Sequence, residues 1–321
     1  MEKEKLIILT GPTAVGKTKI SIGLAKRIGG EIISADSMQV YKGMDIGTDK
    51  ITPEKMQGVK HHMIDILDPS EDFNAFEFKR RAKDIIEDII SRGKIPILVG
   101  GTGFYIQSVL YDVDFEVPES SDESSAYRKE LEEIAKTPEG VHKLYEELVS
   151  IDPEYTKDLH ENNVKRVIRA LSFYKDTGEK MSEHNKEQRE NESPYDFFYF
   201  VLTDDRDVLY DRIEKRIDKM VEEGLVDEVR DIMAQNIKRD ATSMQALGYR
   251  EMISYLDGEI SLDEAIDLLK KNTRHFAKRQ LTWFRREKTV TFIDKKEYGR
   301  DDDLVLDAIV NMIKDRWSNL E

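Results

Sequence analysis

The chain contains no cysteine among its 321 residues. This absence excludes disulfide bonds, thiolate zinc sites and cysteine nucleophiles. No apolar run approaches the length of a membrane span, and the charged start at residues 1–5 leads into an expected strand rather than a signal peptide. The sequence also has no internal repeat. We therefore expect a cytoplasmic protein without a membrane segment, and we take a monomer as the simplest state.

The composition is that of a globular protein with a strongly charged surface. Hydrophobic residues make up 39% of the chain and charged residues 36%. At roughly 100 to 200 residues per domain, the length indicates about two domains. The net charge of −15 argues against a nucleic-acid partner, but only if the charge is spread evenly along the chain.

The most specific motif is a phosphate-binding P-loop, G-x-x-x-x-G-K-[ST]. In such a loop, backbone N–H groups and the start of the following helix bind a phosphate, and the lysine neutralises its oxygens. We expect Lys17 to neutralise the phosphate and the Thr18 hydroxyl to bind Mg²⁺. The motif residues are Gly11, Pro12, Thr13, Ala14, Val15, Gly16, Lys17 and Thr18.

Short β-rich runs alternate with helical patterns along the first hundred residues, which is typical of βαβ units on a parallel sheet. We expect strands at 6–10, 31–35, 62–66, 95–99, 197–202 and 289–293, and helices at 17–28 and 73–91. The predicted fold class is α/β: a P-loop NTPase-like core with a parallel sheet and helices on both faces, followed by a helical C-terminal region.

The segment between the fourth and fifth expected strands has a different character. A polar loop at 117–125 precedes helical patterns at 126–135, 140–150 and 163–175, and a second polar stretch at 184–193 closes the segment. The simplest interpretation is a helical insertion domain, 120–195, carried by an α/β core made of 1–119 and 196–321.

Two further strand ends carry unusual polar residues. Ligands of open α/β sheets bind beyond the carboxyl ends of the strands. The run Asp36-Ser37-Met38-Gln39 follows the second expected strand, and Gly100-Gly101-Thr102-Gly103 follows the fourth. An Asx turn or a helix cap would also explain the first run, and a tight strand-to-helix turn the second.

Two acidic or histidine-rich patterns are better explained without a metal. His61 and His62 are adjacent on an expected strand, so their side chains point to opposite faces and cannot easily share one ion. Asp65 and Asp68 resemble a second metal-binding strand of an NTPase. We favour a turn before Pro69 for these two residues.

Two basic sets interrupt the acidic average. A helix face that combines cations with aromatic rings suits a nucleic-acid backbone and a stacked base. The alternative is a solvated helix whose cations are paired with carboxylates. A smaller pair, Arg212 and Arg216, consists of either surface charges or clamps on a phosphate. The first set is Lys165, Arg166 and Arg169, and the second, at helical spacing, is Lys270, Lys271, Arg274, His275, Lys278, Arg279, Trp283, Phe284, Arg285 and Arg286.

Several segments resemble, in the same order, the motifs of bacterial tRNA dimethylallyltransferases of the MiaA type. The resemblance covers nearly the whole chain, and several of its motifs are specific to that family rather than to P-loop proteins at large. The segments are 11–18, Asp36-Ser37-Met38-Gln39-Val40-Tyr41, Gly43-Met44-Asp45-Ile46-Gly47-Thr48, Gly100-Gly101-Thr102-Gly103, 166–171, Gly248-Tyr249-Arg250 and Lys278-Arg279-Gln280-Leu281-Thr282-Trp283-Phe284-Arg285.

The resemblance implies transfer of a dimethylallyl group from dimethylallyl diphosphate to N6 of the adenosine immediately 3′ of the anticodon, with release of diphosphate. The P-loop then holds the diphosphate of the donor instead of ATP. By resemblance, Asp36 accepts the N6 proton, Thr102 steadies the diphosphate, and either Arg212 or Arg216 assists. Eukaryotic relatives carry a zinc-finger tail, which a chain without cysteine cannot form.

The resemblance also implies an extended contact with the anticodon arm of tRNA, with the insertion domain gripping it. Gln39 has an amide suited to an adenine edge. The residues implied to contact tRNA are Asp36, Ser37, Met38, Gln39, Thr102, Arg128, Lys165, Arg166, Arg169, Lys278, Arg279, Gln280, Trp283 and Arg285.

Other chemistries remain open at this point. A P-loop kinase that transfers a phosphoryl group from ATP to a small metabolite could use the insertion as a lid, but it leaves the basic helix at 270–286 unexplained. An RNA-binding protein with a vestigial nucleotide site leaves Asp36 unexplained. A prenyltransferase acting on free AMP would need neither basic set.

Overall fold

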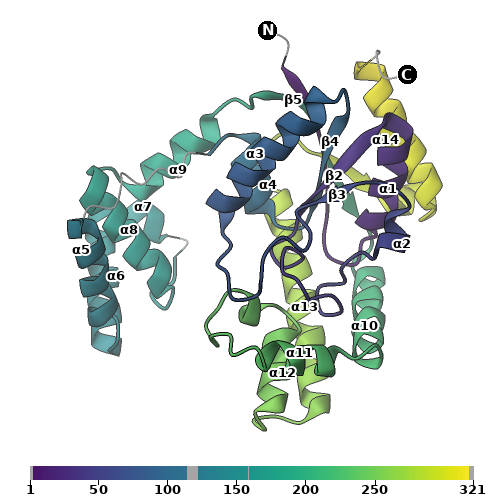
Figure 1. Cartoon of the computed structure of the whole chain (residues 1–321). Helices are drawn as coiled ribbons and strands as arrows, with labels where there is room; N and C mark the ends of the chain where they lie inside the picture. The colour runs from purple at the N-terminus through teal and green to yellow at the C-terminus, as the bar shows by residue number, and fades with distance from the viewer. Residues whose placement is uncertain (1–2, 114–121, 158, 318–321) are drawn as a thin grey trace. The chain divides into compact units, whose positions relative to one another are not determined.

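The computed structural model describes residues 3–113, 122–157 and 159–317. In this part of the chain, six strands form one parallel sheet in the order β3-β2-β4-β1-β5-β6 (Figure 1). The strands are β1 (Glu4–Thr10), β2 (Gly30–Ala35), β3 (His61–His62), β4 (Ile95–Gly100), β5 (Tyr195–Thr203) and β6 (Thr291–Asp294).

Strand β1 lies inside the sheet because its sequence is apolar on both faces. Leu6, Ile7, Ile8 and Leu9 are all fully buried, as expected for a parallel strand covered by helices on both sides. The chain leaves β1 toward β2 on one side and returns as β5 on the other. Such a reversal opens a crevice at the carboxyl end of the central strand.

Helices cover both faces of the sheet, as the sequence predicts. On one face, α1 (Lys17–Ile28) and α14 (Asp302–Arg316) share a core with Ile7, Leu9 and Ile97. On the other, α3 (Ala75–Ser91) packs on β2 and β4, and α4 (Gly103–Leu110) packs on α3. The short helix α2 (Pro53–Met56) precedes β3. The predicted α/β fold is therefore confirmed.

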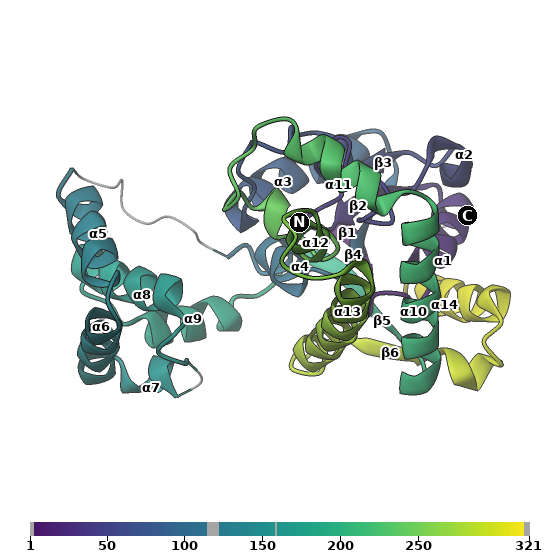
Figure 2. The same cartoon turned by 90° about the horizontal axis from the view of Figure 1, so that it is seen from below.

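The C-terminal region is mostly helical. Helix α10 (Arg206–Glu222) runs beside the 23-residue helix α13 (Leu262–Phe284), and α12 (Tyr249–Leu256) packs against both α11 (Leu225–Met233) and α13 (Figures 1 and 2). A capping box between Ser261 and Glu264 starts α13. Short 3₁₀ turns lie at Ser243–Gln245 and Lys295–Tyr298.

The chain divides into two compact units, Met1–Leu110 with Pro194–Glu321, and Tyr111–Ser193. The second unit has its own core, which includes Leu131, Leu144 and Leu171. Its helices are α5 (Asp122–Ile134), α6 (Pro138–Ile151), α7 (Pro153–Thr156), α8 (Val164–Thr177) and α9 (Met181–Glu190). The expected boundary at 119/120 and residues 117–121 of the expected polar loop lie outside the described residues.

The structure adds to or differs from the expected local structure at three places. The strand expected at 62–66 is only His61–His62, because Met63 and Asp65 adopt positive φ angles of 65° and 54° that end the strand. The polar stretch at 184–193 is largely helix α9. The last strand begins at Thr291, two residues later than expected. Among the described residues, no helix is long and apolar enough to span a membrane.

Candidate active site

The carboxyl ends of β1, β2 and β4 border one cavity of about 580 Å³. Helices α10 and α13 and the segment before α12 complete its wall. The structure therefore brings together most of the residues that the sequence singles out in the core. Those lining the cavity are Thr13, Ala14, Gly16, Lys17, Thr18, Asp36, Ser37, Met38, Gln39, Thr102, Arg212, Arg216, Arg279 and Gln280.

The P-loop has the backbone of an anion cradle. Gly11 and Gly16 have φ angles of 147° and 95°, which favour glycine, and Ala14 is held at 64°. A side chain at Gly11 would place its Cβ 2.5 Å from the carbonyl oxygen of Leu202 on β5. No side chain caps α1, so its first N–H groups are left for a ligand.

Lys17 is held over the loop by two backbone carbonyls. Its Nζ donates to the oxygens of Gly11 and Pro12 at 3.0 and 2.9 Å. Burial of the ammonium, and then the nearby Arg216, lower the pKa of Lys17 to about 8, although Asp36 and Asp49 oppose that shift. A bound anion would raise this pKa again, because it favours the charged form of the lysine.

The two arginines of α10 differ in what they hold. Arg216 donates to the Thr13 hydroxyl of the P-loop and to Asp49 Oδ2 at 3.1 Å. Arg212 lies 3.0 Å from the fully buried carboxylate of Asp204, which also binds Arg300. Both line the cavity, but only Arg216 of the two touches the P-loop directly.

Asp36 forms the Asx turn that its sequence context allows, and it also lines the cavity. Its Oδ1 accepts hydrogen bonds from the backbone N–H groups of Met38 and Gln39 at 2.9 and 3.3 Å, which is an Asx turn. The same carboxylate borders the cavity next to Lys17. The turn thus fixes one oxygen and orients the other.

Thr102 directly precedes helix α4. Its backbone N–H donates to the carbonyl of Ala35 at 3.2 Å, and its carbonyl accepts from Tyr105 at 3.0 Å. Its side chain lines the cavity. The backbone link to Ala35 keeps the ends of β2 and β4 in a fixed relation.

The glycines around Thr102 leave space for neighbouring parts of the protein. A Cβ at Gly100 would overlap the backbone of Ala35, one at Gly101 the Gln280 amide, and one at Gly103 the ring of Trp283. None of the three has a positive φ. Gly101 and Gly103 therefore allow a close approach by α13, and Gly101 also lines the cavity.

Gln280 ties the P-loop to this glycine-rich turn. It is only 6% exposed. Its Oε1 accepts from the Thr13 N–H at 2.8 Å, and its Nε2 donates to the Gly101 carbonyl at 3.0 Å. The sequence placed Gln280 on the tRNA-contacting face, whereas both of its amide atoms bond to the core.

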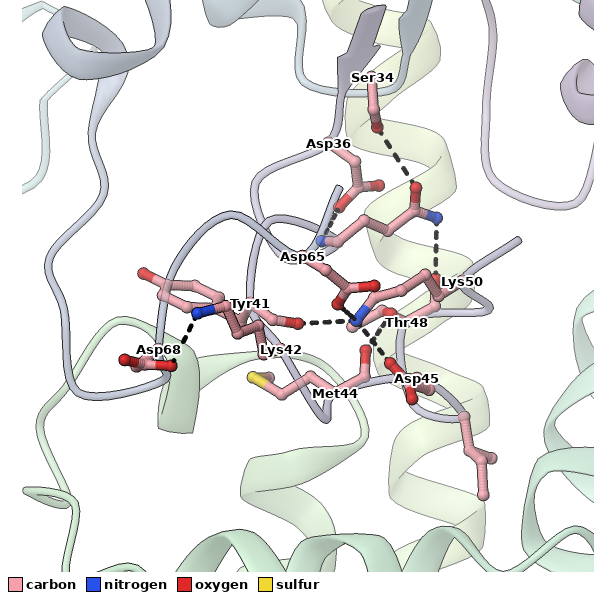
Figure 3. Close-up of polar contacts among 12 residues, drawn as sticks. Ser34, Asp36, Tyr41, Lys42, Met44, Asp45, Thr48, Lys50, Asp65 and Asp68 are labelled. Carbon is pink, nitrogen blue, oxygen red and sulfur yellow. Dashed lines mark hydrogen bonds and ion pairs between the residues drawn. The ribbon is translucent and has the colours of Figure 1, made fainter. Parts of the chain in front are cut away.

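Gln39 is likewise engaged inside the protein. Its Oε1 accepts from Ser34 at 3.3 Å, and its Nε2 donates to the carbonyl of Thr48 at 3.2 Å (Figure 3). The loop that carries Thr48 therefore sets the orientation of this amide in the cavity wall.

The expected single cationic face of α13 is split in two. Lys270 and Arg274 form ion pairs with Asp218 and Glu214 of α10 at 2.5 and 2.6 Å, so they join two helices. For these two residues the structure matches the alternative of a helix whose cations are paired with carboxylates. Beyond them, a second hollow of about 430 Å³ is lined by His275, Lys278, Arg279, Thr282, Trp283 and Arg286; Arg285 is exposed.

The basic residues of the second unit lie on helix surfaces. Lys165, Arg166 and Arg169 are exposed on α8, whose opposite side buries Val167 and Leu171. Arg128 on α5 is exposed and lies 3.4 Å from Glu132. These four residues belong to the second unit, and none of them is among the residues that line the cavity.

The histidine and aspartate patterns have structural roles. His61 bonds the carbonyl of Val59, and His62 lies 2.8 Å from the buried carboxylate of Glu31. Asp65 and Asp68 form ion pairs with Lys50 and Lys42. Among the described residues, no cluster of three or more His, Asp or Glu side chains could hold a metal.

Sequence reasoning missed two charged residues that support the site. Lys295, only 3% exposed, donates to the Val15 carbonyl beneath the P-loop at 3.2 Å and to Asp302 at 2.6 Å. Glu228 on α11 binds the backbone of the Gly43–Thr48 motif. The sequence signal for Glu228 was indirect. The motifs Gly43–Thr48 and Gly248-Tyr249-Arg250 are both family-specific, but no role for either follows from the sequence alone.

A family profile described as IPP transferase matches residues 39–287. The chain belongs to the IPP transferase family. The matched range contains the Asp45–Asp49 loop, the glycine-rich turn, α10 and all of α13, so the profile spans the cavity wall except the P-loop and Asp36–Met38.

Full-length relatives extend the match to the P-loop. The chain is 56% identical, over 95% of its length and 96% of the relative, to a tRNA dimethylallyltransferase of Lachnoclostridium phytofermentans. It is 46% identical to the crystal structure of a tRNA isopentenylpyrophosphate transferase from Bacillus halodurans, with a TM-score of 0.73 and coverage of 98% and 99%. A eukaryotic dimethylallyltransferase acting on tRNA gives a TM-score of 0.83 at 30% identity, covering 99% of this chain and 80% of the other.

Binding of inorganic diphosphate near pH 8 should be accompanied by proton uptake at Lys17. The free protein holds Lys17 with a pKa of about 8, and a bound anion favours the charged form. Calorimetry in buffers of different ionisation enthalpy measures the uptake. In the variant Lys17→Arg the side chain is always charged, so the proton uptake that comes from residue 17 should be absent. Equal proton uptake by both proteins would contradict the assignment to Lys17.

Replacing Gln280 with alanine should lower the free energy of unfolding by about 1–3 kcal/mol, because it removes the partner of the partly buried Thr13 N–H and Gly101 carbonyl. Urea denaturation measures the change. Lys278→Ala, two residues away on the exposed side of α13, serves as the control and should change stability little. Equal effects of the two substitutions would argue against the bridge.

Proposed function

We propose that this protein transfers the dimethylallyl group of dimethylallyl diphosphate to N6 of the adenosine on the 3′ side of the anticodon in tRNA, releasing diphosphate. The observation that carries the proposal is the composition of one cavity wall. A phosphate-binding loop, the carboxylate of Asp36 and an apolar set line the same space. The apolar set, suited to a short alkyl chain, is Ile217, Met220, Leu247, Leu269 and Phe276.

In the proposed reaction, the adenine N6 forms a bond to C1 of the prenyl group while the bond from C1 to the diphosphate oxygen breaks. Asp36 accepts the proton that N6 loses. An exocyclic amine is a weak nucleophile because its lone pair is delocalised, so a carboxylate fixed by its own turn assists as the new bond forms.

The leaving diphosphate gains negative charge as the bond breaks. The uncapped N–H groups at the start of α1, the Lys17 ammonium and the Arg216 guanidinium surround the position where this charge develops. Fixed donors of this kind stabilise the transition state more than the substrate. We assign the assisting role to Arg216 rather than Arg212, because Arg216 contacts Thr13, and we keep Thr102 beside the diphosphate as the resemblance implies.

The site also fits Mg²⁺. The Thr18 hydroxyl in the first turn of α1 lines the cavity, and Mg²⁺ is commonly bound by one or two protein oxygens together with substrate phosphates and water. Bound there, the ion would neutralise charge on the diphosphate.

The tRNA surface is proposed on the two remaining basic sets. Lys278, Arg279 and Trp283 border the second hollow beside the cavity-lining stretch of α13, and Lys165, Arg166, Arg169 and Arg128 provide exposed cations on the second unit. A mononucleotide acceptor would need no such surface. We propose that the protein acts as a monomer in the cytoplasm. Family membership leaves the kinase alternative without support.

The variant Asp36→Asn tests the proton-accepting role. Its amide oxygen can keep the Asx turn, whereas the basic oxygen is removed, so kcat should fall by about 10²-fold or more with little change in the KM for the donor. The assay measures prenylation of an unmodified anticodon stem-loop. Asp68→Asn, an exposed carboxylate paired with Lys42, is the control. A kcat within about twofold of wild type would refute the assignment.

The double variant Lys278→Ala/Arg279→Ala should weaken tRNA binding and make the slope of log Kd against log salt shallower, by about one unit for each phosphate that the protein no longer neutralises. Filter binding across a salt series measures it. The matched control, Lys270→Ala/Arg274→Ala, removes the same charge from the same helix where it pairs with α10. An identical slope change in both double variants would assign the effect to net charge.

A further inference from the structure

One carboxylate binds three successive backbone N–H groups of the loop at residues 45–49. Glu228 Oε2 accepts from Asp45 and Ile46 at 2.9 and 2.7 Å, and Oε1 accepts from Gly47 at 2.9 Å. Hydrogen bonds to a charged acceptor are stronger than neutral ones. The carboxylate occupies the concave side of this turn, much as a bound anion would.

Helix α12 supports the same carboxylate. The Tyr249 hydroxyl donates to Glu228 Oε1, and burial, together with the charge of Glu228, raises the pKa of Tyr249 well above its usual range, which keeps the donor proton in place. A Cβ at Gly47 would lie 2.5 Å from the Tyr249 ring. The loop and the tyrosine therefore pack in direct contact.

Lys50 fixes the loop from its other side. The lysine is only 4% exposed, and its Nζ binds the Tyr41 carbonyl at 2.7 Å and the carboxylates of Asp45 and Asp65 at 2.5 and 2.6 Å (Figure 3). The loop is thus held between a buried cation and the carboxylate of Glu228.

The end of this loop contacts two residues that line the cavity, Gln39 and Arg216. The carbonyls of Thr48 and Asp49 accept from the Gln39 amide at 3.2 and 3.5 Å, and the Asp49 carboxylate pairs with Arg216 at 3.1 Å. Gly47, Thr48 and Asp49 line the cavity, whereas Glu228 lies behind the loop and outside the described lining.

We infer that Glu228 is a positioning residue for prenyl transfer: through the loop at 45–49 it sets the orientation of Gln39 and Arg216. The inference rests on the proposed function. It also explains why the chain carries the motifs Gly43–Thr48 and Gly248-Tyr249-Arg250. The backbone of the first and Tyr249 of the second bind the same Glu228 carboxylate.

The variant Glu228→Gln is the direct test. The glutamine keeps the size of the side chain but replaces one acceptor oxygen with an NH₂ group, which cannot accept a hydrogen bond from the backbone. We expect kcat/KM for tRNA prenylation to fall by about 10-fold to 100-fold, as small displacements of reacting groups do. Asp227→Asn, the adjacent and 76% exposed residue of α11, should retain wild-type activity.

A double-mutant cycle separates positioning from general destabilisation. Asp49→Asn weakens the ion pair with Arg216 at the other end of the loop. If Glu228 acts through this loop, the double variant Glu228→Gln/Asp49→Asn will be about as slow as the slower single variant. Multiplying effects, or an active Glu228→Gln protein, would overturn the inference.

Tyr249→Phe provides a milder second probe if Glu228→Gln fails to fold. It removes one hydrogen bond to Glu228 and keeps the ring against Gly47, so we expect a drop of about twofold to tenfold that is also non-additive with Asp49→Asn. Prenylation by the wild-type protein tests the proposed function separately, because it does not depend on either variant. An active wild type with fully additive variants would remove only the positioning role.

Discussion

The site depends on the close approach of helix α13 to two strand ends. Glycines 100, 101 and 103 leave no side chain where Ala35, Gln280 and Trp283 lie, and Gln280 then bonds both the P-loop and the glycine-rich turn. Because the same helix exposes Lys278 and Arg279 directly before Gln280, the surface proposed for tRNA is connected to the P-loop through one helix. A shift of α13 along its axis would displace Thr13 and Gly101 together.

A second constraint is the concentration of cations near the P-loop of an acidic protein. Lys17, Arg216 and the buried Lys295 all bind P-loop atoms, while the chain carries a net charge of −15. Each cation has a protein partner: loop carbonyls hold Lys17, Asp49 holds Arg216, and Asp302 holds Lys295. These partners limit repulsion in the free protein. The pKa of Lys17 is nevertheless lowered, first by burial of its ammonium and then by the charge of Arg216.

The sequence predicted what depends on local pattern. The P-loop has a fixed spacing, β1 is apolar on both faces, and α1 matches its expected bounds of 17–28. The sequence did not predict features that depend on contacts with residues far away in the chain. The charges of Lys270 and Arg274 have helical spacing like those of Lys278, and only the position of Asp218 and Glu214 on α10 separates the two groups. Likewise, the strand expected at 62–66 ends early because the loop geometry at Met63 and Asp65 overrides strand propensity.

The contact between Glu228 and the loop at 45–49 shows why such links cannot be predicted from spacing. A glutamate on an amphipathic helix has the pattern of a solvent-exposed residue, and three of the other eight residues of α11 are charged. Its role arises only when three backbone N–H groups converge on it from 181 to 183 positions away. Backbone donors carry no side-chain signal, since every residue except proline has one. The motif Gly43–Thr48 is therefore specific in sequence for two reasons visible only in three dimensions: Gly47 must admit the Tyr249 ring, and the turn must present its amides to one carboxylate.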